Sequence, residues 1–287
     1  MITIGDKAVS SIFLGTTNVK EAYLGDKRIW PSRGGVVTYM DGTKADLEYT
    51  ELHGYNVCDM NSIEDKTLVV AIDFEPSSTR LYKSPYGTYN GMFAAFPNVT
   101  SITFQGDALE YSYDVSQHSL TWFDFYQTSI KTFKFPRDIS EEGLGKNIII
   151  PFMECSNLES VDVSDLPQSI KIGNSWFKDC PRLREIIGDI RLENGIGGHD
   201  NSQAFYGCTS LSALTIQEGV SKLGQRCFHN CSSLGTLTFL DTTPPTLADS
   251  TVFDGVNEDI RILVPSEAVA AYKEAWPTME NRIFGLE

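Results

Sequence analysis

One stretch recurs along the sequence: Phe205-Tyr-Gly-Cys208-Thr-Ser-Leu211-Ser-Ala-Leu214-Thr-Ile216. Its template is F-x-x-C-x-x-L-x-x-[LIV]-x-[LIVF], and three further copies fit it. These are Phe152-Met-Glu-Cys155-Ser-Asn-Leu158-Glu-Ser-Val161-Asp-Val163, Phe177-Lys-Asp-Cys180-Pro-Arg-Leu183-Arg-Glu-Ile186 and Phe228-His-Asn-Cys231-Ser-Ser-Leu234-Gly-Thr-Leu237-Thr-Phe239. Between residues 152 and 253 the phenylalanines recur every 23 to 28 residues, which predicts a stack of repeats.

Weaker copies extend the pattern in both directions. Phe93-Ala-Ala-Phe96-Pro-Asn-Val99-Thr-Ser-Ile102-Thr-Phe104 has phenylalanine in the cysteine position. A degenerate copy begins at Ile130-Lys-Thr-Phe133-Lys-Phe135, after an aromatic run of Trp122, Phe123 and Phe125. A last, partial copy runs from Phe253-Asp-Gly-Val256 to Ile260-Arg-Ile262.

Each repeat has two spacings. The F-x-x-C-x-x-L part has a period of three, which favours a short helical or 3-10 turn, and the last apolar positions alternate, as in a strand with one buried face. One repeat buries too few side chains to offset about 1–2 kcal/mol of backbone entropy per ordered residue. We therefore predict a β-rich α+β fold, a solenoid whose stacked repeats share one core.

The template resembles the BspA-type leucine-rich repeat family. The link from Val220 to Phe228 resembles that family's V-x-x-I-G-x-x-A-F segment, with Leu223 for isoleucine and Cys227 for alanine. The tail, which contains Thr243-Pro-Pro-Thr246 and the run 263–273, resembles the family's C-terminal cap. The resemblance covers roughly residues 67–284. It implies a leucine-rich-repeat solenoid used for surface adhesion and for protein or glycan binding, without catalytic residues.

The first 31 residues carry a separate repeat of period ten, apolar-x-apolar-Gly followed by a polar turn and another apolar residue. Its units begin at Ile2, Ile12 and Ala22. Three such hairpins cannot bury their own apolar residues well, so they are expected to dock elsewhere. This segment resembles short N-terminal modules of phage tail and other virion proteins from gut bacteroidal hosts. The resemblance implies attachment to other virion proteins and assembly into a homo-oligomer.

Four segments follow from these patterns. Residues 1–31 form the small N-terminal β module, and residues 32–66 a β-hairpin lead-in with strands at 36–39 and 45–49 around Asp41-Gly42. Residues 67–262 form the repeat solenoid, opened by a strand at 67–74. Residues 263–287 form a C-terminal helical cap, with Ser266 as N-cap, a helix at 267–276 and Pro277 as its stop.

Composition excludes several classes of function. The formal net charge of −15 argues against sequence-independent binding to nucleic acid or anionic lipid. No run approaches 18 apolar residues, and no basic region precedes an apolar one near the start, so neither membrane insertion nor a Sec signal is expected. Four of the six cysteines share one template position, which favours buried structural thiols over disulfides or zinc. The four histidines lie in no nucleophile motif, so we expect no catalytic, cofactor-binding or metal-binding residue.

Two groups of residues are candidates for binding. Polar positions on the predicted strands form one exposed column, beside mostly small neighbours at positions 101, 132, 160, 185, 213 and 236. Tyrosines in two aromatic segments are the second group, because exposed aromatic rings stack on sugars and anchor protein interfaces. The candidates are Thr103, Lys134, Asp162, Thr215 and Thr238 in the column, and Tyr82, Tyr86, Tyr89, Tyr111 and Tyr113 in the aromatic segments.

Three hypotheses about function remain open. The first is a non-enzymatic virion structural or receptor-binding protein of a bacterial virus, assembled in the host cytoplasm, with a host-surface glycan or protein as its ligand. The second is a BspA-like adhesin on the bacterial cell surface. The third, ranked last, is a glycan-processing enzyme, which requires two carboxylates about 5–9.5 Å apart in a cleft.

Overall fold

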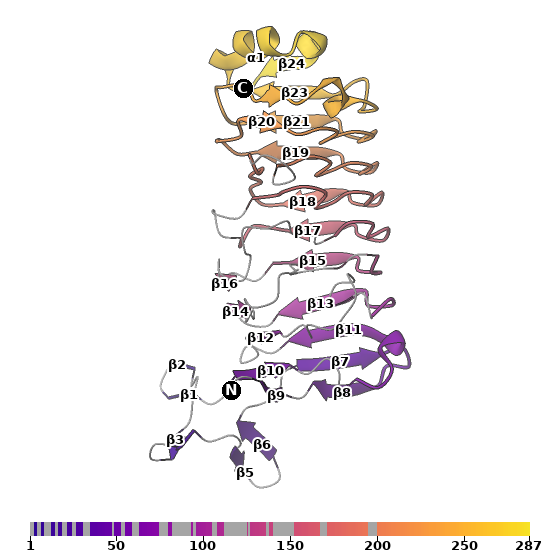
Figure 1. The fold of residues 1–287 in the computed structure, drawn as a ribbon, viewed down its shortest axis with the longest axis vertical. Coiled ribbons are helices and arrows are strands. Elements are labelled where there is room, and N and C mark those ends of the chain that lie inside the picture. The colour runs from indigo at the N-terminus through magenta and orange to yellow at the C-terminus, as the bar shows by residue number, and fades with distance from the viewer. Residues whose placement is uncertain are drawn as a thin grey trace.

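The structure is a computed structural model. It describes side chains at residues 35–47, 63–74, 93, 96–103, 125, 127–135, 152–166, 171–194 and 200–287. Strands outside these ranges are described by their backbone alone. The chain is rich in β-strands and has few helices, as predicted, and its strands stack along the long axis of the molecule (Figure 1).

The largest sheet has seven strands, in the order β18-β17-β15-β13-β11-β7-β8. The five strands from β11 to β18 are parallel and come from successive repeats. The hairpin β7–β8 pairs antiparallel with β11 and turns at Asp41-Gly42, as predicted, where Gly42 takes a φ of +83°. The strands are β7 Gly35–Tyr39, β8 Lys44–Leu47, β11 Val69–Phe74, β13 Ser101–Phe104, β15 Thr132–Lys134, β17 Ser160–Asp162 and β18 Glu185–Ile187.

The strand predicted at 67–74 begins two residues later, at Val69. Residues Lys66–Leu68 form a short 3-10 turn, η2, instead. The Asp65 carboxylate accepts hydrogen bonds from the backbone and the side chain of Thr67, and this capping favours a turn there over a strand.

A second sheet of four strands, β19-β21-β23-β24, continues the stack and is parallel throughout. The hydrogen-bonded ladder stops after β18, where Gly188, with a φ of +105°, stands in the place of an apolar template residue. Two positions later the Ile190 side chain is buried, and the backbone there forms an isolated β-bridge with Ile216. The strands are β19 Ala213–Ile216, β21 Thr236–Phe239, β23 Arg261–Val264 and β24 Ile283–Gly285.

Short strands form the remaining sheets. One has the order β16-β14-β12-β10-β9, another pairs β20 with β22, and each predicted ten-residue unit near the N-terminus forms a two-stranded antiparallel sheet. Their bounds are β1 Thr3–Ile4, β2 Lys7–Ala8, β3 Phe13–Leu14, β4 Thr17–Asn18, β5 Ala22–Leu24, β6 Lys27–Trp30, β9 Tyr49–Leu52, β10 Tyr55–Cys58, β12 Arg80–Leu81, β14 Ala108–Tyr111, β16 Asp138–Ile139, β20 Lys222–Leu223 and β22 Thr246–Leu247.

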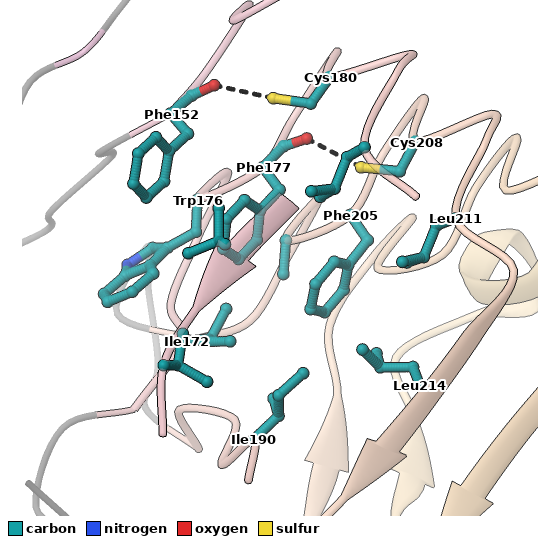
Figure 2. Close-up of a cluster of buried hydrophobic side chains, with 14 of the residues drawn as sticks. Phe152, Ile172, Trp176, Phe177, Cys180, Ile190, Phe205, Cys208, Leu211 and Leu214 are labelled. Atoms are coloured by element: carbon teal, nitrogen blue, oxygen red, sulfur yellow. Dashed lines mark hydrogen bonds between the residues drawn. The ribbon is translucent and has the colours of Figure 1, made fainter. Parts of the chain in front are cut away.

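A column of stacked phenylalanine rings runs through the core. Neighbouring rings lie 4.9–5.9 Å apart between centroids, with planes tilted by only 3–14°. The column consists of Phe93, Phe125, Phe152, Phe177, Phe205, Phe228 and Phe253. Figure 2 shows its central members. The predicted anchors are therefore confirmed, but the degenerate copy begins at Phe125 and not at Ile130.

The cysteine of each repeat bonds to the repeat before it. The thiols of Cys155 and Cys180 donate to the backbone oxygens of Phe125 and Phe152, each at 2.8 Å, and those of Cys208 and Cys231 donate in the same way to Phe177 and Phe205. Figure 2 shows the bonds of Cys180 and Cys208. All four thiols are buried, as predicted, and none of them is in a disulfide. They also act as hydrogen-bond donors, a role that simple apolar packing does not require.

The residue before each of these cysteines has a left-handed backbone. Glu154, Asp179 and Asn230 have φ values of 59°, 56° and 60°, and Gly207 has 73°. Their N–H groups point forward and donate to carbonyls of the next repeat at 2.7–2.9 Å. The turn thus exchanges a local conformational cost for hydrogen bonds between repeats.

At the C-terminus a short helix, α1 Val269–Ala275, follows a 3-10 turn, η4 Ser266–Ala268. The predicted N-cap is wrong, because the Ser266 hydroxyl donates to the carbonyl of Leu286 at 2.6 Å and no side chain caps either helix. Two further 3-10 turns are η3 Ser250–Phe253 and η5 Pro277–Arg282. Strand β24, which follows α1, was not predicted from the sequence.

Replacing Phe177 with alanine should lower the free energy of unfolding by about 3–5 kcal/mol, because it leaves a cavity between the rings of Phe152 and Phe205. Urea titration followed by circular dichroism measures the change. Exposed Ser232, changed to alanine, is the control and should stay within about 0.5 kcal/mol of the parent. A Phe177→Ala variant as stable as the control would contradict the central place of the ring column.

The left-handed turn makes a second prediction at Asp179. Glycine accepts a φ of 56° freely, whereas a β-branched side chain does not. Asp179→Val should therefore be less stable than Asp179→Gly by at least about 1–2 kcal/mol. Equal thermal and urea midpoints for the two variants would show that the turn relaxes without cost.

Candidate functional site

The outward side of the stacked strands, which we call the strand face, holds the predicted polar column. Register places Lys134 opposite Asp162, and Thr215 opposite Thr238. Thr103 lies on β13, and its hydroxyl donates to the carboxylate of Asp73 on β11. The small-residue column beside it is also confirmed, since Ser101, Thr132, Ser160 and Glu185 follow one another across the sheet, as do Ala213 and Thr236. The sheet break separates the candidates into two groups.

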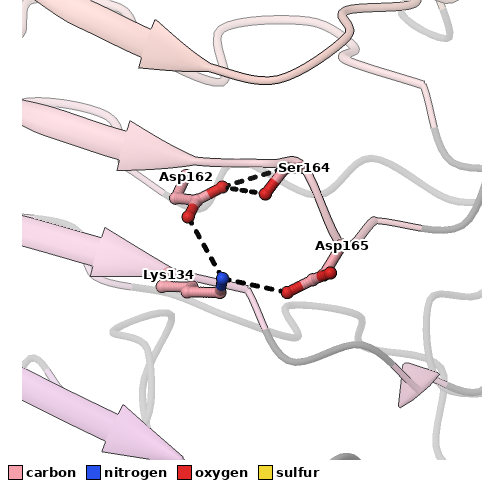
Figure 3. Close-up of polar contacts among 4 residues, drawn as sticks. All are labelled: Lys134, Asp162, Ser164 and Asp165. Carbon is pink, nitrogen blue, oxygen red and sulfur yellow. Dashed lines mark hydrogen bonds and ion pairs between the residues drawn. The ribbon is translucent and has the colours of Figure 1, made fainter.

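The charged candidates in the first group, Lys134 and Asp162, form an ion pair with each other. The Lys134 Nζ atom lies 3.0 Å from a carboxylate oxygen of Asp165 and 3.3 Å from one of Asp162 (Figure 3). The second oxygen of Asp162 accepts hydrogen bonds from the backbone and hydroxyl of Ser164. Partial burial acts to raise the pKa of Asp162, but the bonds from Ser164 and Lys134 together outweigh it and the pKa is lowered. The hydrogen bond to Asp165 and, as the second largest cause, the hydrogen bond to Asp162 raise the pKa of Lys134. This cluster ties two repeats together, and its single positive charge is shared between two carboxylates.

In the second group one prediction is wrong. Thr215 is exposed, but Thr238 is only 9% exposed. Thr238 lies on β21, between Thr215 on β19 and Leu263 on β23, and these two side chains lie directly beside it. These neighbours cover Thr238, whereas Thr103, which also lies in the middle of a sheet, is exposed.

The aromatic candidates cannot be placed in the same way. Tyr82, Tyr86, Tyr89 and Tyr113 lie outside the described residues. Tyr111 ends strand β14, whose backbone alone is described. Their role in binding therefore stays a prediction.

Three residues of the strand face were missed from the sequence. Ile187 is 47% exposed and continues the column next to Asp162, and Phe284 is 41% exposed on β24. The Arg261 guanidinium lies over the Phe284 ring at 5.2 Å from its centroid. The pair Ile186-Ile187 departs from the apolar–polar alternation of the other repeats, and that departure was the available signal.

The cysteine thiols in the described part of the chain are buried. Burial raises the pKa of the thiols of Cys180, Cys208 and Cys227 well above its ordinary value and that of Cys231 to about 12. His229 stacks on Tyr206 with ring centroids 5.1 Å apart, while His53, His118 and His199 lie outside the described residues. In the described part of the chain no three His, Cys, Asp or Glu side chains gather in a way that could hold a metal ion. Nor does any helix there have the length and apolar character needed to cross a bilayer.

These features, a phenylalanine-anchored turn followed by a parallel strand in each repeat, define a leucine-rich repeat protein. A family model, described as BspA type leucine-rich repeat region, matches residues 89–199 and 151–258, with six copies. The chain therefore belongs to the BspA-type leucine-rich repeat family, as the sequence motif predicted. No curated protein matches the chain. The family match does not include residues 1–31, so the resemblance of that segment to virion modules remains a prediction.

The buried thiols predict a pH dependence. Because the pKa of Cys231 is about 12 in the folded state and about 9 when exposed, the thiol ionises first in the unfolded chain. Its contribution to stability is full below pH 9 and falls as the pH rises towards 12. Each buried thiol of this kind should add up to about 1.4 kcal/mol per pH unit to the decrease in the free energy of unfolding over this range.

The measurement is urea unfolding at several pH values between 8 and 11, for the parent chain and for Cys231→Ala. The alanine variant should start less stable and should lose stability less steeply with pH. Parallel slopes for the two proteins would mean that Cys231 ionises equally easily in both states.

Proposed function

We propose that this chain is a non-enzymatic contact protein, a solenoid whose surface binds another macromolecule. Membership of the BspA-type family carries the proposal, because it indicates a repeat protein for adhesion or protein contact. The burial of the described thiols supports binding over catalysis.

The solenoid interpretation is supported by the continuous ring column and by parallel strands of matching register in successive repeats. Helix α1 would cap its C-terminal end. Tyr272 on this helix and Trp276, the residue directly after it, are buried, and both pack against Phe239, while Trp276 also contacts Phe253, the last ring of the column. A cap of this kind keeps the last repeat from exposing its core to water.

As a finer assignment, we propose a virion structural or receptor-binding protein of a bacterial virus, attached to other virion proteins through residues 1–31. The period-ten repeat of that segment supports it, since short hairpins need another surface to cover their apolar side chains. A BspA-like adhesin on the bacterial surface agrees equally well with the family match.

Antibodies raised against residues 200–287 would decide between these two locations. They should label purified virus particles from lysates of cells that encode the chain, and the label should be lost from particles when residues 1–31 are deleted. Labelling of intact, virus-free cells would instead identify a surface adhesin. Labelling of neither particles nor cells would reject both forms of the proposal.

A further inference from the structure

The two large sheets meet between β18 and β19, at a place we call the β18–β19 joint. Both strands lie in the described part of the chain, where no ladder of hydrogen bonds joins them. Parallel ladders join the strands on either side of the joint, from β11 to β18 and from β19 to β24. The joint therefore divides the stack into two sheets that are each continuous.

Two extra residues in the first of the two repeats account for the break. The repeats touch where the N–H of Ser212 donates to the carbonyl of Arg184. They touch again where Ile190 forms an isolated bridge with Ile216. Between these two contacts the first repeat has five residues and the second has three. The longer segment has to bulge, and Gly188 within it has a φ that permits this.

The strands hold the joint loosely. The nitrogen of Ser212 lies 3.4 Å from the carbonyl oxygen of Arg184. The equivalent bonds one repeat before and one repeat after, from Arg184 to Glu159 and from Gly235 to Ser212, are both 2.9 Å long. A distance of 3.4 Å is beyond the usual range for N–H···O bonds, so the remaining contact at the start of the two strands is weak.

The ring column shows an angle at the same place. The planes of Phe177 and Phe205 are tilted by 14°, whereas the other steps of the column have tilts of 3–6°. The two rings still stack, with centroids 5.6 Å apart. The core is thus continuous across the joint, but the two repeats are not parallel there.

The phenylalanine turns hold the joint as firmly as in the other repeats. The N–H of Phe177 donates to the carbonyl of Ala204 at 2.9 Å, and that of Asp179 to the carbonyl of Tyr206 at 2.7 Å. The thiol of Cys208 donates to the carbonyl of Phe177 at 3.0 Å. We call this the turn side of the joint, and the side of β18 and β19 the strand side.

A buried amide holds the links, the segments that lead from each strand to the next turn. Asn201 is only 1% exposed, and its Nδ2 donates to the carbonyls of Glu193 and Lys222 at 2.7 and 2.8 Å. Its Oδ1 accepts from the N–H of Gly224 at 2.7 Å. Glu193 belongs to the link before the joint, and Lys222 and Gly224 to the link after it. One side chain therefore ties the two links together.

Two sides of the joint are held and the third is loose, which leaves one direction of motion. We propose that the β18–β19 joint is a hinge. The part that carries β19, β21, β23 and β24 rotates as one body against the part that carries β11 to β18, and the rotation opens and closes the strand side. This motion changes the curvature of the strand face. A partner that touches both sheets would select one angle, whatever its chemistry.

Distances between pairs of spin labels on the full-length chain, measured by double electron–electron resonance, test the hinge. Each label is carried on a ketone-bearing amino acid, which leaves the native cysteines unchanged. The first pair, at Thr132 and Arg261, spans the strand side of the joint. The second, at Ser129 and Asn257, spans the turn side between the same two repeats. Rotation about the turns should make the distance distribution of the first pair about twice as wide as that of the second.

The matched control for the strand side is a pair at Thr38 and Glu185. The register places these residues in one row of the first sheet, five strands apart, and Thr132 and Arg261 are also five strands apart. Five spacings of about 4.8 Å give about 24 Å for both pairs. The control pair crosses no break, so its distribution should be as narrow as that of the turn-side pair.

Deleting Gly188 and Asp189 should close the joint, because three residues then lie between Arg184 and Ile190, as in the neighbouring repeats. In this variant the distribution of the strand-side pair should narrow to that of the control pair. The hinge is rejected if the strand-side pair is as narrow as the control in the parent chain, or if the turn-side pair is equally wide. It is also rejected if the deletion variant folds and the distribution stays wide. If the deletion variant does not fold, the three pairs in the parent chain still decide.

Discussion

The structure depends on one contact repeated along its axis, in which a phenylalanine ring stacks on the ring of the next repeat while its backbone oxygen accepts a thiol hydrogen from that repeat. Stacking alone leaves the rings free to slide, because dispersion between flat surfaces has little directionality. The thiol bond to the Phe152 oxygen fixes the position of Cys180, and with it the whole Phe177 turn. Thr128, the hydroxyl residue in this position of the Phe125 repeat, is buried like the cysteines and contacts the Cys155 sulfur at 3.7 Å. Both contacts lie between repeats, so no repeat can form them alone.

The same geometry explains why unfavourable backbone angles recur. A turn that faces its neighbour on both sides has N–H groups that water cannot reach, and each must find an acceptor. The left-handed residue before the cysteine turns its N–H towards the next repeat, where it meets a carbonyl at 2.7 Å for Glu154 and Asp179. Only some repeats have glycine at this left-handed position. In the repeats that have another residue there, the conformational cost is outweighed by the hydrogen bonds between neighbouring repeats.

Sequence alone predicted the interior better than the surface. Phe152, Phe177, Phe205 and Phe228 were recognisable because their spacing to cysteine and leucine is constant. Phe125 was not recognised as the anchor of its repeat because that repeat lacks one residue: Ile130, not residue 131, is the next buried side chain. The break after β18 follows from Gly188, whose φ of +105° and whose close approach to the Ser164 backbone exclude any other residue. On the strand face, exposure depends on which strands lie alongside, so the burial of Thr238 and the exposure of Phe284 could not be predicted from the spacing within one repeat.

Function in such a protein is expected where the repeat is broken, because positions that obey the template are committed to holding neighbouring repeats together. The apolar Ile187 at a polar template position and the added strand that carries Phe284 are two such departures, and both leave more than 40% of a large apolar side chain exposed to water. The neighbouring buried Ile190 and Ile283 complete the core, so the exposed parts of Ile187 and Phe284 are not needed for it. A departure from the template that exposes an apolar side chain, and that the core does not need, is best explained by contact with the surface of another molecule. This is why the strand face around them, and not the regular repeats, is the part of the described molecule on which binding should be sought.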